Sequence, residues 1–117
     1  MNIDKILKMY KEEGYNEDQI YQIELGLSKN VNVSIYLDKI FHWKDMQEIR
    51  LGLEEYLDVS LYANYFFNWE QMKEIRLGLL DDINVTLYAM PEYDAKEMQK
   101  IRLYLLKRKE IKNVTNI

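Results

Sequence analysis

A step of 26 residues recurs along this chain of 117 residues and limits the folds that it can adopt. The similar segments WKDMQEIRLGL and WEQMKEIRLGL begin at Trp43 and Trp69. Residues 41–66 are identical to residues 67–92 at half of the aligned positions. Four rows of apolar residues keep the step: Ile20/Met46/Met72/Met98, Ile23/Ile49/Ile75/Ile101, Leu27/Leu53/Leu79/Leu105 and Tyr15/Phe41/Phe67/Tyr93. Such self-similarity is typical of stacked repeats, in which each unit packs only on its neighbours.

The first part of each repeat has the pattern of an α-helix of roughly 13 residues. Met72, Ile75 and Leu79 share one face of this helix, whereas Leu77 points nearly opposite, so the helix should have neighbours on two sides. Candidate N-caps and the polar residues three positions later form the pairs Asn16/Gln19, His42/Asp45, Asn68/Gln71 and Asp94/Glu97. At Asn16, Asn68 and Asp94 the residue types and this spacing are typical of a capping box.

The second part of each repeat reads VNVSIYL, LDVSLYA or INVTLYA, beginning at Val31, Leu57 and Ile83. Its alternation is compatible with a strand. A short helix that buries Val59 and Tyr62 is the preferred interpretation, because the leucine-rich-repeat signature that accompanies one strand per repeat is absent. Asn32, Asp58 and Asn84 are the expected N-caps of the short helices.

Between the long and the short helix, we expect one residue with a left-handed backbone conformation: Asn30, Tyr56 or Asp82. Asparagine tolerates that conformation and tyrosine does not, so Tyr56 departs from the pattern.

Both ends of the chain deviate from the repeat. Residues 1–14 read as a capping half-repeat, which would extend a tyrosine row of Tyr10, Tyr36, Tyr62 and Tyr88. We therefore predict one all-α domain, a right-handed stack of about four helix–short-helix repeats forming a short α-solenoid. Its units are the half-repeat, the repeats 15–40, 41–66, 67–92 and 93–108, and a basic tail, 109–117.

A glycine interrupts the long helix at the same position in three repeats, as Gly26, Gly52 and Gly78, and Tyr104 replaces it in the fourth. Glycine inside a helix costs ~1 kcal/mol relative to alanine. Because it lacks a Cβ, it lets another segment approach closely. We expect each glycine to receive the following repeat, so that the last helix can carry a tyrosine.

The composition argues against catalysis and cofactor binding. There is no cysteine and only one histidine, His42, whose repeat position indicates a capping role. No nucleophile elbow, phosphate loop or metal motif is present, so we predict a non-enzyme without cofactor or metal. No segment resembles a signal peptide or a membrane span, and the expected location is cytoplasmic. Asn32, Asn84 and Asn113 begin N-x-S/T triplets that we attribute to capping or chance.

Arginines form a row at Arg50, Arg76 and Arg102. They could bind nucleic-acid phosphates, but residues 1–92 carry 9 Lys/Arg against 17 Asp/Glu, which makes a poor surface for a polyanion. The preferred interpretation is structural: each guanidinium bonds carboxylates or carbonyls at a repeat junction, with stacking on Trp43 or Trp69 as an additional contact.

A binding surface should lie at positions where the repeats differ in sequence. Apolar residues that the repeat does not demand are either local packing or binding anchors: Tyr56, Tyr65, Phe66 and Leu80. An acidic stripe is expected beside them on the solvent side of the long helices: Glu48, Glu55, Glu70, Glu74 and Asp81. The fourth repeat and the tail form a basic patch: Lys96, Lys100, Lys107, Arg108 and Lys109.

The phrase W-x-x-M-x-E-I-R-L-G-L followed by D-V-S-L-Y-A resembles a short repeat of small proteins from Firmicutes phages and mobile elements. The resemblance covers residues 15–105 and is clearest from Trp43 to Ala63 and from Trp69 to Ala89. It implies a mobile-element setting, in which small acidic proteins often inhibit host defence, including as anti-CRISPR proteins. That step rests on setting and size alone.

The expected function is therefore binding to another protein, as an inhibitor that occludes a host defence complex such as a CRISPR-Cas nuclease. Two alternatives remain open. One is nucleic-acid binding through the basic fourth repeat, and the other is self-association between the acidic third repeat and the basic fourth.

Overall fold

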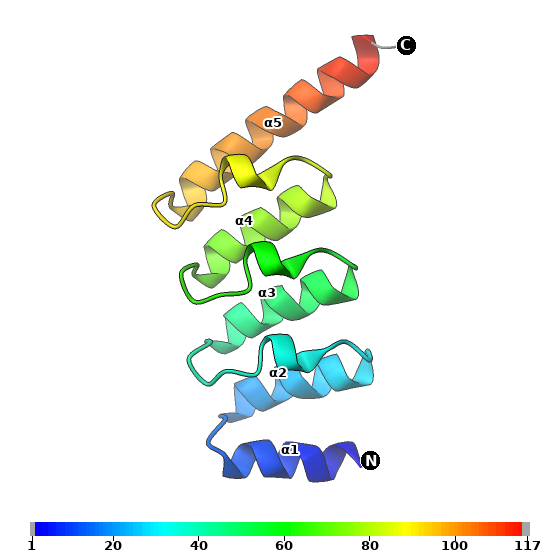
Figure 1. The fold of residues 1–117 in the computed structure, drawn as a ribbon, viewed down its shortest axis with the longest axis vertical. Coiled ribbons are helices and arrows are strands. Elements are labelled where there is room, and N and C mark those ends of the chain that lie inside the picture. The colour runs from blue at the N-terminus through cyan, green and yellow to red at the C-terminus, as the bar shows by residue number, and fades with distance from the viewer. Residues whose placement is uncertain (1, 116–117) are drawn as a thin grey trace.

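The computed structural model describes residues 2–115, and within them all regular structure is helical. The α-helices are α1 (Ile3–Glu12), α2 (Glu17–Ser28), α3 (Trp43–Glu54), α4 (Trp69–Leu80) and α5 (Ala95–Thr115). Single 3₁₀ turns lie between the long helices: η1 (Val33–Ile35), η2 (Val59–Leu61) and η3 (Val85–Leu87). Each long helix packs on the next, in a stack measuring 55 × 31 × 17 Å (Figure 1). The predicted all-α repeat architecture is confirmed.

Capping boxes begin the long helices, as the sequence predicts. The Asn68 side chain accepts from the Gln71 amide at 2.9 Å, and the Gln71 side chain accepts from the Asn68 amide at 2.9 Å. The same reciprocal pair joins Asn16 to Gln19. His42 caps α3 through Nδ1, which accepts from the Lys44 amide at 3.2 Å. The predicted capping role of the histidine is confirmed.

The helices α2, α3 and α4 are each followed by a left-handed residue. Asn30, Tyr56 and Asp82 have φ of 60°, 58° and 53°, at the predicted positions. The next amide then reaches back to the helical glycine, with Ile83 N donating to Gly78 O at 3.1 Å. This bond is characteristic of the Schellman motif, and it turns the chain back along the helix that it has just completed.

The second part of each repeat is helical, and the strand alternative is wrong. In η2 the Asp58 carboxylate accepts from the Ser60 amide at 3.2 Å and from its hydroxyl at 2.5 Å. Asn32 and Asn84 cap η1 and η3 in the same way, so capping explains those two N-x-S/T triplets. Each 3₁₀ turn aims one tyrosine into the core, where Tyr36, Tyr62 and Tyr88 are fully buried.

The helical glycines make room for these tyrosines. A Cβ on Gly78 would lie 2.0 Å from Tyr88 Oη and 2.7 Å from Val85 Cγ1, and Gly26 and Gly52 have equivalent neighbours. The expected partner was wrong, because the glycine receives side chains of its own repeat and not the repeat that follows. Tyr104 fits the corrected account, since within the described residues no 3₁₀ turn follows α5.

The two ends of the stack differ from the internal repeats. The half-repeat forms a complete α-helix, α1, rather than a 3₁₀ turn, and Tyr10 packs edge-on against Tyr15 with ring centroids 5.7 Å apart. At the other end, α5 continues without a break through the predicted tail as far as Thr115, and residues 116–117 lie outside the described chain. No helix within residues 2–115 is long and apolar enough to cross a membrane.

Asp45 cannot make a hydrogen bond between repeats that its counterparts make. Gln19 and Gln71 occupy the equivalent position in the neighbouring repeats. Gln71 Nε2 donates to Tyr93 O at 2.6 Å, and Gln19 Nε2 donates to Phe41 O at 2.7 Å. A carboxylate cannot make that bond, and burial raises the pKa of Asp45.

Asp45→Gln should therefore stabilise the protein by ~1 kcal/mol at neutral pH, the net value of a typical hydrogen bond. Asp45 binds its proton more tightly in the folded than in the unfolded protein, so protonation removes its penalty as the pH falls through the raised pKa. The gain from the substitution should shrink accordingly. Urea denaturation at neutral and acidic pH measures both effects, and an equal gain at both values would contradict this explanation.

Candidate functional site

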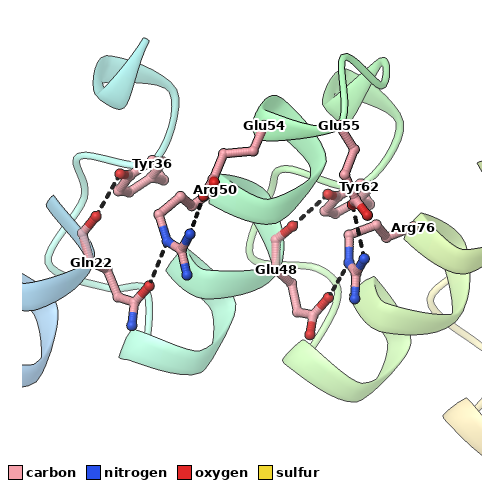
Figure 2. Close-up of polar contacts among 8 residues, drawn as sticks. All are labelled: Gln22, Tyr36, Glu48, Arg50, Glu54, Glu55, Tyr62 and Arg76. Atoms are coloured by element: carbon pink, nitrogen blue, oxygen red, sulfur yellow. Dashed lines mark hydrogen bonds and ion pairs between the residues drawn. The ribbon is translucent and has the colours of Figure 1, made fainter. Parts of the chain in front are cut away.

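The arginine row lies at the junctions between long helices, and Figure 2 shows two of its members, Arg50 and Arg76. Arg76 of α4 reaches α3, where its Nε donates to Glu48 at 2.7 Å and its Nη1 to Glu55 at 2.9 Å. Tyr62 Oη donates to the Glu48 backbone carbonyl at 2.6 Å. Glu48 thus bonds the next helix through its side chain and its own 3₁₀ turn through its backbone.

The neighbouring junctions repeat this arrangement. Arg102 Nε donates to Glu74 at 2.8 Å, and its Nη1 lies 3.7 Å from Asp81. Arg50 Nε donates to the neutral Gln22 side chain at 3.0 Å, and its Nη1 pairs with Glu54 of its own helix. The three arginines are only 7 to 9% exposed, so the structural interpretation is confirmed and a phosphate-binding ladder is wrong. The cation over Trp43 and Trp69 is Lys44, at 5.6 and 4.8 Å from the ring centroids, and not an arginine.

Most residues of the predicted acidic stripe are not exposed to solvent. Glu48 and Glu74 are 5 and 8% exposed, because the next helix covers them and an arginine pairs with each. Glu55 and Asp81 are half-buried at the same junctions, and only Glu70 faces solvent freely. The sequence carries a signal for this network: an acid precedes an arginine by 28 residues at Glu48/Arg76 and at Glu74/Arg102.

The four predicted apolar anchors are exposed, but the structure does not bring them together. Tyr56 and Leu80 lie at the edge where the long helices end, and Tyr65 and Phe66 lie in the loop before the next helix begins (Figure 1). A helix of 12 residues, about 18 Å long, separates these two edges. They cannot form one compact site.

The loop edge holds three exposed apolar side chains, which we call the aromatic edge and define as Ile40, Tyr65 and Phe66. These side chains are 70, 62 and 71% exposed. The Tyr65 ring lies 5.8 Å from the Phe66 ring and 6.4 Å from the ring of buried Phe41, so core packing holds it in place. All three line a hollow of about 440 Å³ that also includes His42 and Trp69.

Tyr56 lies at the opposite edge, where it lines a shallow hollow with Asn30 and Leu53. It is 96% exposed and adopts the left-handed conformation at φ 58°, so it contributes almost no packing in return for its backbone strain. A strained and exposed aromatic residue is a candidate for a binding role.

Tyr56→Asn should stabilise the isolated protein by ~1 kcal/mol, because asparagine tolerates the left-handed region. Asn30→Tyr, at the same position of the preceding repeat, supplies the matched reverse change and should destabilise by a similar amount. Thermal and urea denaturation of both variants measure the effect. A Tyr56→Asn protein less stable than its parent would show that the tyrosine supports the fold.

The basic patch is exposed except at one residue. Lys96, Lys100, Lys107 and Arg108 all face solvent on α5. Lys109 instead donates to the backbone carbonyls of Asp81 and Asp82, at 2.7 and 3.2 Å, and so caps the end of α4. Its role is structural.

The remaining titratable groups bear on whether the chain could hold a metal ion or carry out acid–base chemistry. Within residues 2–115 no group of three His, Cys, Asp or Glu side chains is placed to hold a metal ion. The buried tyrosines are structural donors, and burial raises the pKa of Tyr36, Tyr62 and Tyr88, which keeps their hydroxyls protonated. Comparisons with protein-family models, curated proteins and solved structures give no significant match.

Proposed function

We propose that the chain is a non-enzymatic protein-binding module whose principal anchor is the aromatic edge. The observation that carries this proposal is that Ile40, Tyr65 and Phe66 are all exposed and line the same hollow in the surface. Exposed apolar patches mark interaction sites, and aromatic side chains dominate the binding free energy of protein interfaces.

The repeat supports this assignment because the fold does not require the two aromatic residues. Tyr65 and Phe66 correspond to Lys39 and Ile40 in the preceding repeat and to Pro91 and Glu92 in the following one. The equivalent turns of those two repeats therefore form without an aromatic residue. The neighbouring core does position Tyr65, through its contact with Phe41, which reduces the entropy that binding would cost.

For the partner, we propose a host defence complex such as a CRISPR-Cas nuclease, with the chain acting as an occluding inhibitor encoded by a phage or mobile element. This choice rests on the resemblance of the repeat to mobile-element proteins. The exposed aromatic edge supports an occluding mode of action, because such a surface can cover part of another protein without chemistry of its own.

The decisive experiment compares the protein with a Tyr65→Lys/Phe66→Glu variant as baits for host lysate and for purified nuclease complexes. These replacements are residues that the chain already uses, at Lys39 and Glu92, so the fold should be retained. A partner that binds through the aromatic edge should bind the variant roughly 30-fold or more weakly, as expected for hot-spot residues. Circular dichroism checks that the helices remain.

Tyr21→Lys is the matched control, because Tyr21 is 56% exposed on α2 and lies outside the aromatic edge. It should bind like the parent protein. A partner retained equally by the parent, the control and the aromatic-edge variant would overturn the assignment of this surface. Retention of no protein by any bait would overturn the binding function itself.

A further inference from the structure

The last helix presents a second surface, distinct from the aromatic edge, at the open end of the stack. Arg102 of α5 points back to α4, and no further helix covers the other side of α5 within the described chain (Figure 1). That open face carries Leu103 and Tyr104, which are 49 and 60% exposed, between Lys100 and Lys107. We call these four residues the open face.

The repeat register shows what each open-face residue would contact. Lys100 and Lys107 occupy the positions that Glu74 and Asp81 hold one repeat earlier. At that earlier junction, Glu74 accepts a hydrogen bond from Arg102 of the next helix, and Asp81 forms an ion pair with the same arginine at 3.7 Å. The open face therefore keeps the two charged positions of a helix junction and reverses their charge, whereas Tyr104, contacted by Arg108, replaces the glycine that packs against a 3₁₀ turn in the internal repeats.

We propose that the open face binds an amphipathic α-helix of a partner protein that carries a carboxylate where the internal junctions carry arginine. The carboxylate would lie between the ammonium groups of Lys100 and Lys107. Apolar residues of the partner helix would cover Leu103 in place of a further repeat. Charge complementarity and the charged positions shared with the internal junctions together specify this occupant.

The apolar content of the open face favours a helix over nucleic acid. Phosphate contacts need cations, but they gain nothing from the exposed leucine between the two lysines. A cap that served only for solubility would be polar throughout, as terminal repeats usually are.

The probe is a fluorescein-labelled, helix-stapled peptide of residues 67–82 carrying Arg76→Glu, and the control is the same peptide with its native arginine. Stapling is needed because an isolated helix of this length is marginal in water. Fluorescence anisotropy with the full chain at low salt should show the Arg76→Glu peptide binding roughly tenfold or more tightly than the native peptide, whose arginine meets like charges.

Charge reversal on the full chain supplies the strict test. In a Lys100→Glu/Lys107→Glu variant the order should invert, with the native peptide bound more tightly than the Arg76→Glu peptide. Both lysines are solvent-facing, so the variant should remain folded, and circular dichroism checks this. Lys8→Glu, an exposed site on α1 at the other end of the stack, is the control that should leave the order unchanged.

Three outcomes would overturn the proposal. Equal binding of both peptides to the parent protein would show that the charge reversal has no recognition role. Tighter binding of a labelled DNA duplex than of either peptide, lost in the double variant, would assign the face to nucleic acid. Sedimentation that shows dimers abolished by Lys100→Glu/Lys107→Glu, with neither peptide bound, would assign it to a second copy of this chain. None of these results bears on the aromatic edge, which separate variants test.

Discussion

Gly78→Ala should destabilise the protein by roughly 2–4 kcal/mol, because overpacking and the loss of a buried hydrogen bond act together. The new Cβ would lie 2.0 Å from Tyr88 Oη, which donates to the Glu74 carbonyl at 2.6 Å. The tyrosine would have to leave that carbonyl, and its hydroxyl would remain buried without a partner. On an open helical surface the same change would instead stabilise by ~1 kcal/mol. Urea denaturation distinguishes the two signs.

A double-mutant cycle with Tyr88→Phe tests whether the hydroxyl is the cause. Tyr88→Phe alone should destabilise by ~1 kcal/mol through the lost bond. It also removes the atom nearest to the new methyl group, so Gly78→Ala/Tyr88→Phe should be more stable than the sum of the single changes by ~1–2 kcal/mol. The recovery should be partial, because Val85 Cγ1 still lies 2.7 Å from the added Cβ.

Tyr104→Gly provides the control for the same helical position without a 3₁₀ turn. Tyr104 is 60% exposed, so the substitution should destabilise only by the helix propensity of glycine, ~1 kcal/mol or less. A Gly78→Ala protein as stable as its parent would show that the tyrosine hydroxyl can move freely, and the close packing of helix and turn would lose its explanation.

The sequence predicts most of the fold because the signals are local. The capping pair Asn68/Gln71 and the left-handed Asn30 each depend on a few neighbouring residues. The 26-residue step then requires every unit to repeat them. The position of Tyr62 in the core follows from the same register.

The candidate site was harder to predict, because it depends on contacts between repeats. A helical wheel shows that Glu48 and Glu74 share a face, but it does not show that the next helix covers that face. Both residues therefore read as solvent-exposed acids, although each is paired with an arginine 28 residues later. The anchors Tyr56 and Tyr65 are close in sequence, yet the helix direction places them at opposite edges.

The second large effect is expected at the buried ion pair. Arg76→Leu should destabilise the protein by roughly 3–5 kcal/mol, the usual result of removing one partner from a buried pair. The Glu48 and Arg76 side chains are 7 and 10% exposed, so water cannot replace the lost guanidinium. Glu55 loses its donor in the same step. Urea denaturation measures the free energy of unfolding for each variant.

The chain supplies its own control, because the first junction uses a neutral acceptor. Gln22 accepts from Arg50 Nε at 3.0 Å where Glu48 accepts from Arg76. Glu48→Gln should therefore preserve the junction and destabilise by ~1 kcal/mol or less. Glu48→Gln/Arg76→Leu should recover much of the loss caused by Arg76→Leu, since no carboxylate then remains buried at position 48 without a partner. If the double variant is as unstable as Arg76→Leu alone, the loss arises from the packing of the arginine stem and not from the uncompensated charge.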